Sequence, residues 1–138
     1  MSYDILNDQM DDTTVLHLSH SVTGLMYAKD SKGNDDESKP VEIELYGRAS
    51  KVHRQWLALA LRKQDAKQHK KAKTPDEMLE ENAEFFATMT VGIKNMKLGE
   101  VELNTKEAYK QLYAKPKLMW ITEQVSEKLG DVESFLQK

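Results

Sequence analysis

The stretch that decides the fold, 91-VGIKNMKLGEVELNTKEAYKQLY-113, reads as two helical segments separated by a short break. Gly99 lies in the break, where glycine allows the backbone to turn. Asn104 and Glu107 have the spacing of a helix N-cap whose partner glutamate follows three residues later. We therefore predict a compact corner, in which a helix ends near Met96, Gly99 turns the chain and Asn104 caps the next helix.

Two helices are predicted before the turn at Gly99, and the second of them is the one that ends near Met96. Ser50 is a good N-cap, and the residues after it form one apolar face at helical spacing: Val52, Trp56, Leu59 and Ala60. Thr74 and Glu77 form a second capping signature, with Pro75 at the first helical position. The stripe of the helix that begins there contains Leu79, Ala83, Phe86, Met89 or Thr90, and Ile93.

Another helix is predicted after the corner. Pro116 ends the helix that Asn104 begins and suits the first turn of the next one. The new helix has an apolar stripe of Leu118, Ile121, Val125 and Leu129. Gly130 is a natural terminator, and Asp131 can cap a last turn that carries Phe135 and Leu136.

The first third of the chain predicts strands. Val41, Ile43 and Leu45 alternate with polar residues, which is typical of a half-buried antiparallel strand. Residues 13–29 also favour strand, whereas residues 30–40 are turn-rich and acidic and predict a loop. We expect one mainly α (α+β) domain over residues 1–138. It would have a small N-terminal β element in residues 1–47 and four to five helices in residues 48–138.

Charge is unevenly distributed along the chain, although the net charge of the 138 residues is only −3. Residues 1–46 carry 10 acidic and 3 basic side chains. Residues 47–73 carry 1 acidic and 9 basic side chains, and residues 74–138 carry 12 acidic and 8 basic side chains. The basic run, Arg62 to Lys73, could bind phosphate backbones without sequence preference. It lacks interleaved aromatic residues, however, and the whole chain is acidic, so the pattern does not favour nucleic-acid binding.

The sequence offers little for catalysis. It has no cysteine, which removes disulfides and thiolate chemistry and favours a cytosolic location. The four histidines, His17, His20, His53 and His69, lack the spacing of a metal site, and no nucleotide-binding glycine motif or nucleophile elbow occurs. No long apolar run predicts a membrane span, and the acidic first residues do not resemble a signal peptide. We expect neither an enzyme nor a cofactor.

Large apolar residues are more numerous than one small core requires, and we expect some of them to contact a partner or a second copy. The candidates for this surface are Trp56, Met78, Phe85, Met89, Met119, Trp120 and Phe135. Gly99, Asn104 and Pro116 are the structural residues of the corner.

The C-terminal part of the chain resembles the tail assembly chaperones of long-tailed bacteriophages. These proteins have a helix, a glycine turn, a capped helix and a proline-started helix, in that order. The matching positions are Gly99, Val101, Leu103, Asn104, Glu107, Ala108, Leu112, Pro116, Leu118, Ile121, Val125 and Phe135. The segment 41-VEIELYGRASKVHRQW-56 is similar to their strand, glycine and helix start. Met96 stands where the family often has tryptophan.

The resemblance implies a non-enzymatic role in the cytoplasm of a bacterial host and absence from the mature virion. Such proteins coat the tape measure protein and keep it soluble until the major tail protein polymerises around it. Charged helices with wide apolar faces could also support self-association into an open spiral. The alternative hypothesis is a small nucleic-acid-associated or regulatory binding protein that uses residues 62–73.

Overall fold

The computed structural model describes residues 2–66 and 74–131 and contains helices and strands in an α+β arrangement. The helical elements in these ranges are η1 (Ile5–Asp8), α1 (Lys51–Ala66), α2 (Pro75–Met89), α3 (Lys106–Tyr113), η2 (Pro116–Leu118) and α4 (Met119–Gly130). The strands are β1 (Thr13–His17), β2 (Ser19–His20), β3 (Gly24–Leu25), β4 (Tyr27–Lys29), β5 (Asp35–Pro40), β6 (Glu42–Tyr46), β7 (Thr90–Lys94), β8 (Lys97–Leu98) and β9 (Val101–Glu102).

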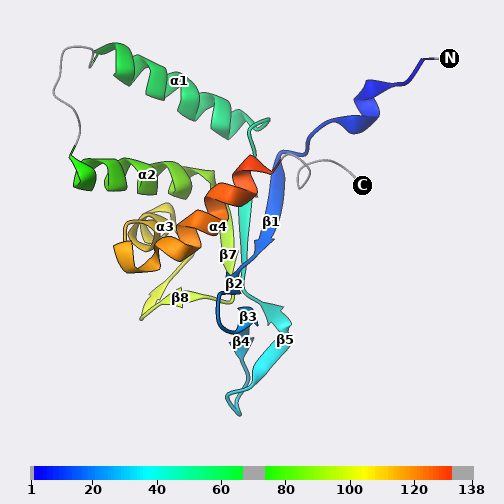
Figure 1. The fold of residues 1–138 in the computed structure, drawn as a ribbon, viewed down its shortest axis with the longest axis vertical. Helices are drawn as coiled ribbons and strands as arrows, with labels where there is room; N and C mark the ends of the chain where they lie inside the picture. The colour runs from blue at the N-terminus through cyan, green and yellow to red at the C-terminus, as the bar shows by residue number, and fades with distance from the viewer. Residues whose placement is uncertain (1, 67–73, 132–138) are drawn as a thin grey trace.

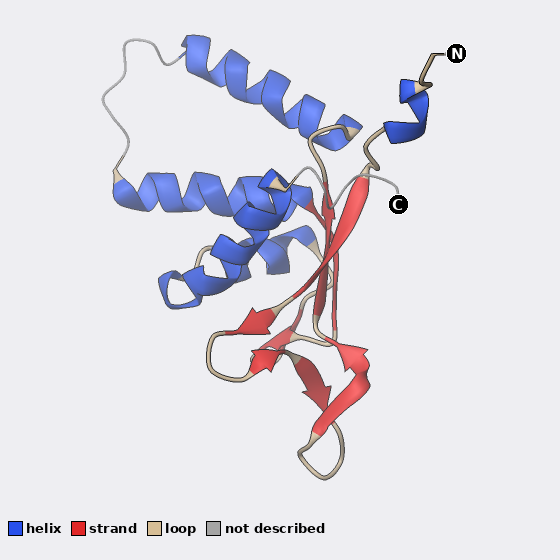
Figure 2. Cartoon of the chain, turned by 45° about the vertical axis from the view of Figure 1, so that its right-hand side comes forward, coloured by secondary structure: helices blue, strands red, loops and turns tan. Residues whose placement is uncertain are grey.

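A three-stranded antiparallel sheet, in the order β1-β6-β7, is the centre of the fold. Its register aligns Leu16 with Ile43 and Ile43 with Ile93, so these three side chains lie on one face. Figure 2 shows α2, α3 and α4 to one side of this sheet. Side chains from both layers form the buried cluster: Leu18, Val41, Ile43, Leu45, Ala83, Ala87, Leu103, Ala108, Tyr109, Leu112, Tyr113, Ile121 and Val125.

The prediction of a mainly α chain with a small N-terminal β element is wrong. The first reason is that α2 ends at Met89 and the chain continues as a strand of the sheet, not as a helix through Ile93. Thr90 has extended backbone angles, and the β-branched residues and Gly92 that follow favour a strand over a helix. Pairing with β6 then satisfies the backbone of this segment.

The second reason is the segment 30–40, which was predicted to be a loop but contains β5. Its strand pairs with β4 in a hairpin, and its side chains are almost all exposed. At the tip, the carboxylate of Asp30 accepts hydrogen bonds from the backbone N–H groups of Lys32 and Asn34, at 2.8 and 3.0 Å. Gly33 adopts a positive φ of 81° there. Turn chemistry and backbone pairing form this hairpin, so apolar alternation gives no signal for it.

Three helix starts were predicted correctly, and one was displaced. The Ser50 hydroxyl accepts from His53 N at 3.2 Å, the Thr74 hydroxyl accepts from Glu77 N at 3.2 Å, and Pro116 begins η2, which leads directly into α4. The N-cap of α3 is Thr105, whose hydroxyl accepts from Ala108 N, and Asn104 is exposed one residue earlier. Adjacent residues of similar capping ability explain the shift.

The corner at Gly99 is a two-residue hairpin turn between β8 and β9. Gly99 has φ of +61°, and among the described residues other than glycine only Asn95 has a positive φ. A positive φ at the first turn position alone is typical of a type II′ turn, which favours glycine there. The turn brings the chain from β7 to the start of α3.

A buried hydroxyl pair joins α2, β7 and α3. The Thr90 and Tyr113 hydroxyl oxygens lie 2.7 Å apart, and the Thr90 hydroxyl donates to the carbonyl of Phe86 at 2.8 Å. Because a hydroxyl has a single proton, Tyr113 is the donor to Thr90. Tyr113 is also among the largest fully buried side chains, so its ring and its hydroxyl fix the same junction.

We predict that Tyr113 makes the fold sensitive to alkaline pH. Burial raises the pKa of Tyr113 from 10.0 to about 12, because a buried phenolate loses its hydration. The unfolded chain releases this proton above pH 10 while the folded chain retains it, so stability is complete below pH 10 and falls as pH rises to about 12. At about 1.4 kcal/mol per pKa unit, the loss approaches roughly 2–3 kcal/mol.

Urea unfolding at pH 8 and pH 11, with Tyr113→Phe as the comparison, measures the part of this loss expected by pH 11, roughly 1.4 kcal/mol. The variant should be less stable by about 1 kcal/mol at pH 8, where it lacks the hydroxyl bond. It should then lose less stability than the wild type between the two pH values. Equal losses in the two proteins would show that Tyr113 is not responsible.

A side-chain amide attaches α4 to the edge of β2. Gln124 Nε2 donates to the carbonyl of Ser19 at 2.7 Å, and Ser19 N donates to Gln124 Oε1 at 3.0 Å. One side chain thus pairs with both backbone groups of a strand residue. The ring of Trp120, one turn earlier on α4, lies edge-on against His20, with 5.4 Å between ring centroids. These contacts hold the beginning of α4 on the segment that follows β1.

We predict that Gln124→Glu destabilises the fold by about 1–3 kcal/mol at pH 7, because the part-buried Ser19 carbonyl would face a carboxylate and lose its donor. Gln111→Glu is the matched control, since Gln111 is exposed on α3 and gains the same charge. Thermal and urea unfolding of both variants provide the measurement. Equal stability of the two variants would contradict the role given to this amide.

Candidate interaction surface

Helix α1 lies alongside α2, on the side of α2 away from α3 (Figure 1). Its inner side carries half-buried Val52, Trp56 and Ala60, which repeat at helical spacing. The ring centroid of Trp56 lies 5.5 Å from that of Phe85 on α2, and His53 lies 6.2 Å from the same ring. Phe85 is therefore the aromatic residue of α2 that contacts α1.

The ring contacts continue from α1 into the core. Phe85 and Phe86 have centroids 5.3 Å apart, and Phe86 and Tyr113 have centroids 5.8 Å apart. Trp56, Phe85, Phe86 and Tyr113 thus form a continuous aromatic series through α1, α2 and α3. Trp56 and Phe85, two of the predicted partner residues, are half-buried within it. Their described contacts are within the chain.

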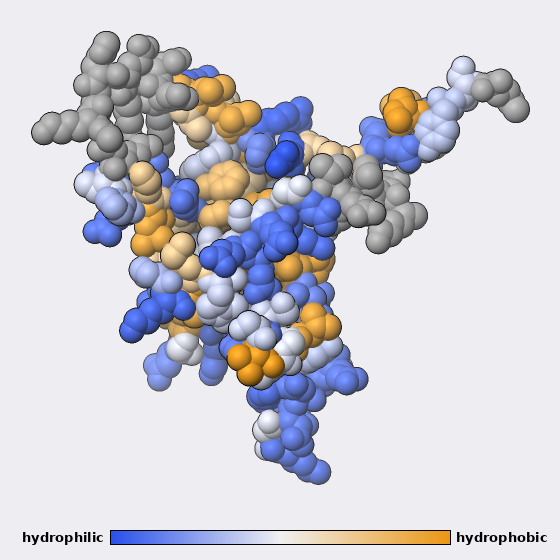
Figure 3. Space-filling view, in the orientation of Figure 1, coloured by the Kyte–Doolittle hydropathy of each residue, from blue (hydrophilic) through white to orange (hydrophobic). Residues whose placement is uncertain are grey.

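The side of α1 that faces away from α2 is also apolar. Leu57 and Leu61 are four residues apart, and they are 49% and 54% exposed. Exposed Ala58 lies between them on the same side, and Arg54 precedes them by one turn. In the space-filling view, α1 is a region where orange apolar side chains gather at the surface (Figure 3). We call Leu57, Ala58 and Leu61 the outer face of α1.

The sequence prediction missed this outer face. It assigned Leu59 to the buried stripe of the helix, but Leu59 is exposed. The available signal was the width of the apolar arc: Leu57, Ala58 and Leu61 repeat at spacings of three and four residues, beside the stripe that contains Trp56. A helix with two such stripes can pack one of them against its own chain and leave the other exposed.

The methionines that were predicted to bind a partner differ in accessibility. Met78 at the beginning of α2 and Met119 at the beginning of α4 are 49% and 45% exposed. Met89, at the end of α2, is fully buried and is therefore a core residue, so that assignment is wrong. In Figures 1 and 2, the beginnings of α2 and α4 lie on the same side of the molecule, away from the sheet. We call Met78 and Met119 the methionine pair.

The other predicted surface residues fall into two groups. Trp120 is half-buried and packs on His20 within the chain. Phe135 lies outside the described residues, as do residues 67–73 of the basic run. Of that run, Arg62 is exposed near the end of α1, and the helix continues to Ala66.

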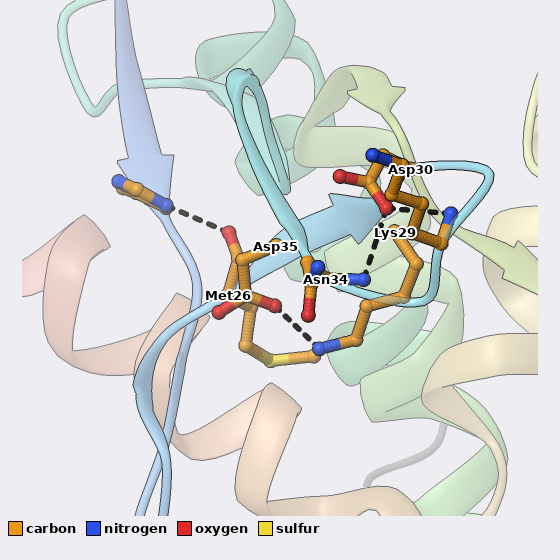
Figure 4. Close-up of polar contacts among 7 residues, drawn as sticks. Met26, Lys29, Asp30, Asn34 and Asp35 are labelled. Carbon is orange, nitrogen blue, oxygen red and sulfur yellow. Dashed lines mark hydrogen bonds and ion pairs between the residues drawn. The ribbon is translucent and has the colours of Figure 1, made fainter.

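A polar hairpin projects from the opposite end of the molecule to α1 (Figure 1). Figure 4 shows its tip, where Lys29 reaches across to Asp35 and the Asp30 carboxylate turns inward to the loop backbone. At the base of the hairpin, His17 Nε2 lies 2.8 Å from the carbonyl oxygen of Met26. His17, Asp30 and Asp35 thus have structural partners within the chain.

Ion pairs connect α2 to α3 at the surface. Lys106 Nζ donates to Glu84 at 2.8 Å, and Lys110 Nζ lies 3.4 Å from the same carboxylate. The hydrogen bond from Lys106 holds the pKa of Glu84 below its ordinary value of 4.5, against the opposing effect of burial. Pairs this exposed contribute little to stability. The shifted pKa therefore reflects a surface connection between two helices and marks no reactive group.

The described ranges, 2–66 and 74–131, contain no group of three or more histidine, aspartate or glutamate residues arranged to hold a metal ion. Within the same ranges, no helix is both long and apolar enough to cross a membrane. The features that stand out in this part of the chain are apolar helix surfaces: the outer face of α1 and the methionine pair.

Comparisons of the chain with protein-family models, curated proteins and solved structures find no match. The geometry of these surfaces and the sequence resemblance are therefore the basis for a proposed function.

We predict that Phe85→Ala loosens α1 selectively. The substitution removes the ring that contacts Trp56 and His53, and the protection of α1 amides should fall by about 2 kcal/mol, less than for a fully buried phenylalanine. Amides of β6 should keep their exchange rates. Leu57→Ala is the control on the same helix, because its side chain faces solvent. Hydrogen exchange followed by mass spectrometry measures both, and equal protection of α1 in the two variants would refute the prediction.

Proposed function

We propose that this chain is a tail assembly chaperone of a long-tailed bacteriophage or prophage. In this role it binds the tape measure protein in the bacterial cytoplasm and keeps it soluble until the major tail protein polymerises. The observation that carries the proposal is the methionine pair, two large, flexible apolar side chains that are 49% and 45% exposed at the beginnings of α2 and α4.

Exposed methionines suit a long helical client. Methionine has three rotatable bonds and a polarisable sulfur, so it adapts to successive surfaces that differ in shape. A long helix presents apolar residues at spacings of three and four, and two separated methionines can contact such a stripe. The contact is small, which allows the major tail protein to displace the chaperone during assembly.

The sequence resemblance supports the same proposal from independent residues. Gly99, Leu103, Ala108, Leu112, Pro116, Ile121 and Val125 have defined structural positions in the corner, in α3 and in α4. Leu103, Ala108, Leu112, Ile121 and Val125 are buried. The resemblance therefore concerns the packing of the last two helices, and the methionine pair lies on the surface of this layer and of α2.

We predict that co-expression of this chain increases the soluble yield of the tape measure protein encoded in the same genome. The double substitution Met78→Asp and Met119→Asp should abolish the effect, because charge would be placed on the contact surface. It should leave the melting temperature of the chain nearly unchanged, since both side chains are half-exposed. Soluble yield, co-purification and thermal unfolding are the three measurements.

Val22→Asp is the matched control, since Val22 is strongly exposed in the turn between β2 and β3. It should keep the wild-type effect on the tape measure protein. No co-purification with the wild-type chain would remove the chaperone proposal. Binding to generic DNA or RNA that weakens steeply between low and moderate salt would instead support the nucleic-acid alternative that uses residues 62–73.

A further inference from the structure

We propose that the outer face of α1 is the docking site for the N-terminal arm, residues 3–10, of a second copy of this chain. The proposal rests on the self-association implied by the proposed function, and it names the two surfaces that meet. Three properties of the described residues carry it: exposed apolar side chains on both surfaces, opposite charge, and the direction of the arm.

The N-terminal arm carries large apolar side chains that are mostly exposed to solvent. Ile5 and Leu6 on η1 are 71% and 66% exposed, and Tyr3 beside them is exposed as well. The arm nevertheless has local order. Asp4 caps η1 by accepting from Leu6 N at 3.1 Å, and the Tyr3 hydroxyl donates to Asp8. A short, ordered segment that exposes adjacent large apolar residues has the composition of a docking element.

The outer face of α1 offers a surface of matching size. Leu57 and Leu61 are separated by one turn, and exposed Ala58 leaves a shallower position beside them. One turn of helix rises about 5 Å, which two or three residues of the arm can cover. Ile5 and Leu6 would thus contact Leu57 and Leu61, beside Ala58.

Charge favours the same pairing. Residues 2–12 carry four aspartates and no basic side chain, whereas residues 51–66 carry four basic side chains and one acidic one. Exposed Arg54 and Arg62 lie near the ends of the apolar outer face, and Asp4 and Asp8 flank Ile5 and Leu6. Opposite charges around an apolar contact increase the association rate and select the orientation.

The direction of the arm points to a second copy. Gly47 N donates to the carbonyl of Asp12 at 2.8 Å, so the base of the arm is attached just before the start of α1. From there the arm and α1 diverge to opposite sides of the molecule (Figure 1). An arm held in this direction reaches away from its own α1. Because the two surfaces differ, the contact is head-to-tail and leaves one surface open at each end of the assembly.

Two substituted chains test the proposal. Ile5→Asp with Leu6→Asp disables the arm, and Leu57→Asp with Leu61→Asp disables α1. We expect the wild type to show a mass that increases with concentration in sedimentation equilibrium. Each double variant alone should associate at least about tenfold more weakly, with an unchanged circular dichroism spectrum. Val22→Asp should associate like the wild type.

Mixing the two variants is the decisive experiment. Each has one intact surface, and these surfaces are complementary, so the mixture should form a complex of one copy of each and no larger species. Charge reversal gives a second readout: Asp4→Lys with Asp8→Lys, and Arg54→Glu with Arg62→Glu, should each weaken association, and their combination should restore it.

Three outcomes would overturn the proposal. If the wild type is monomeric at all concentrations, both the arm contact and the proposed self-association fail. If the wild type associates but both double variants do so equally well, self-association stands on another surface. If both variants are monomeric and their mixture forms no complex, the arm and α1 are not partners. Binding to the tape measure protein is measured separately and does not decide between these outcomes.

Discussion

The hydrogen bond from the Tyr113 hydroxyl to that of Thr90 fixes the point on which the rest of the structure depends. Thr90 is where the chain changes from helix to strand, and its hydroxyl also satisfies the carbonyl of Phe86 in the last turn of α2. Tyr113 brings the end of α3 to the same place. One buried pair of polar atoms therefore fixes how α2, β7 and α3 meet. An apolar pair of the same size would pack at this place without specifying that geometry.

From this junction, the molecule divides into a rigid part and an attached helix. The sheet, α2, α3 and α4 share a buried cluster, whereas α1 is attached through the aromatic contacts of Trp56 and His53 with Phe85. A helix that contacts its own chain on one side can present its other side to a partner at little cost in stability. The proposed docking surface is thus on the element whose displacement would disturb the core least.

The sequence was sufficient to predict an element where its residue pattern is compatible with only one type of secondary structure. Alternation predicted the β6 strand and the burial of Val41, Ile43 and Leu45, and the capping residues Ser50 and Thr74 placed the starts of α1 and α2. The sequence-based prediction failed where one residue pattern is compatible with both a helix and a strand. Ile93 continues the helical stripe of Phe86, but pairing with the β6 edge, together with the β-branched residues and Gly92 around it, makes it a strand residue.

Other features depend on interactions that a sequence pattern does not contain. The β4–β5 hairpin is formed by the Asp30 turn and by backbone pairing, with almost no apolar burial. The surface was harder to predict than the core for a similar reason. Helical spacing identifies an apolar side chain but not the element that covers it, so Met89 was assigned to the surface and Leu59 to the interior.

The amide of Gln124 has a consequence for how this chain behaves at high concentration. A strand edge with unpaired N–H and C=O groups is a template for a foreign strand, and pairing of this kind leads to aggregation. At Ser19 both groups are already bound by a side chain that belongs to a helix and cannot extend a sheet. Gln124 therefore blocks the pairing of a foreign strand at Ser19. Under the proposed chaperone function, a blocked edge would disfavour the backbone pairing by which chains aggregate.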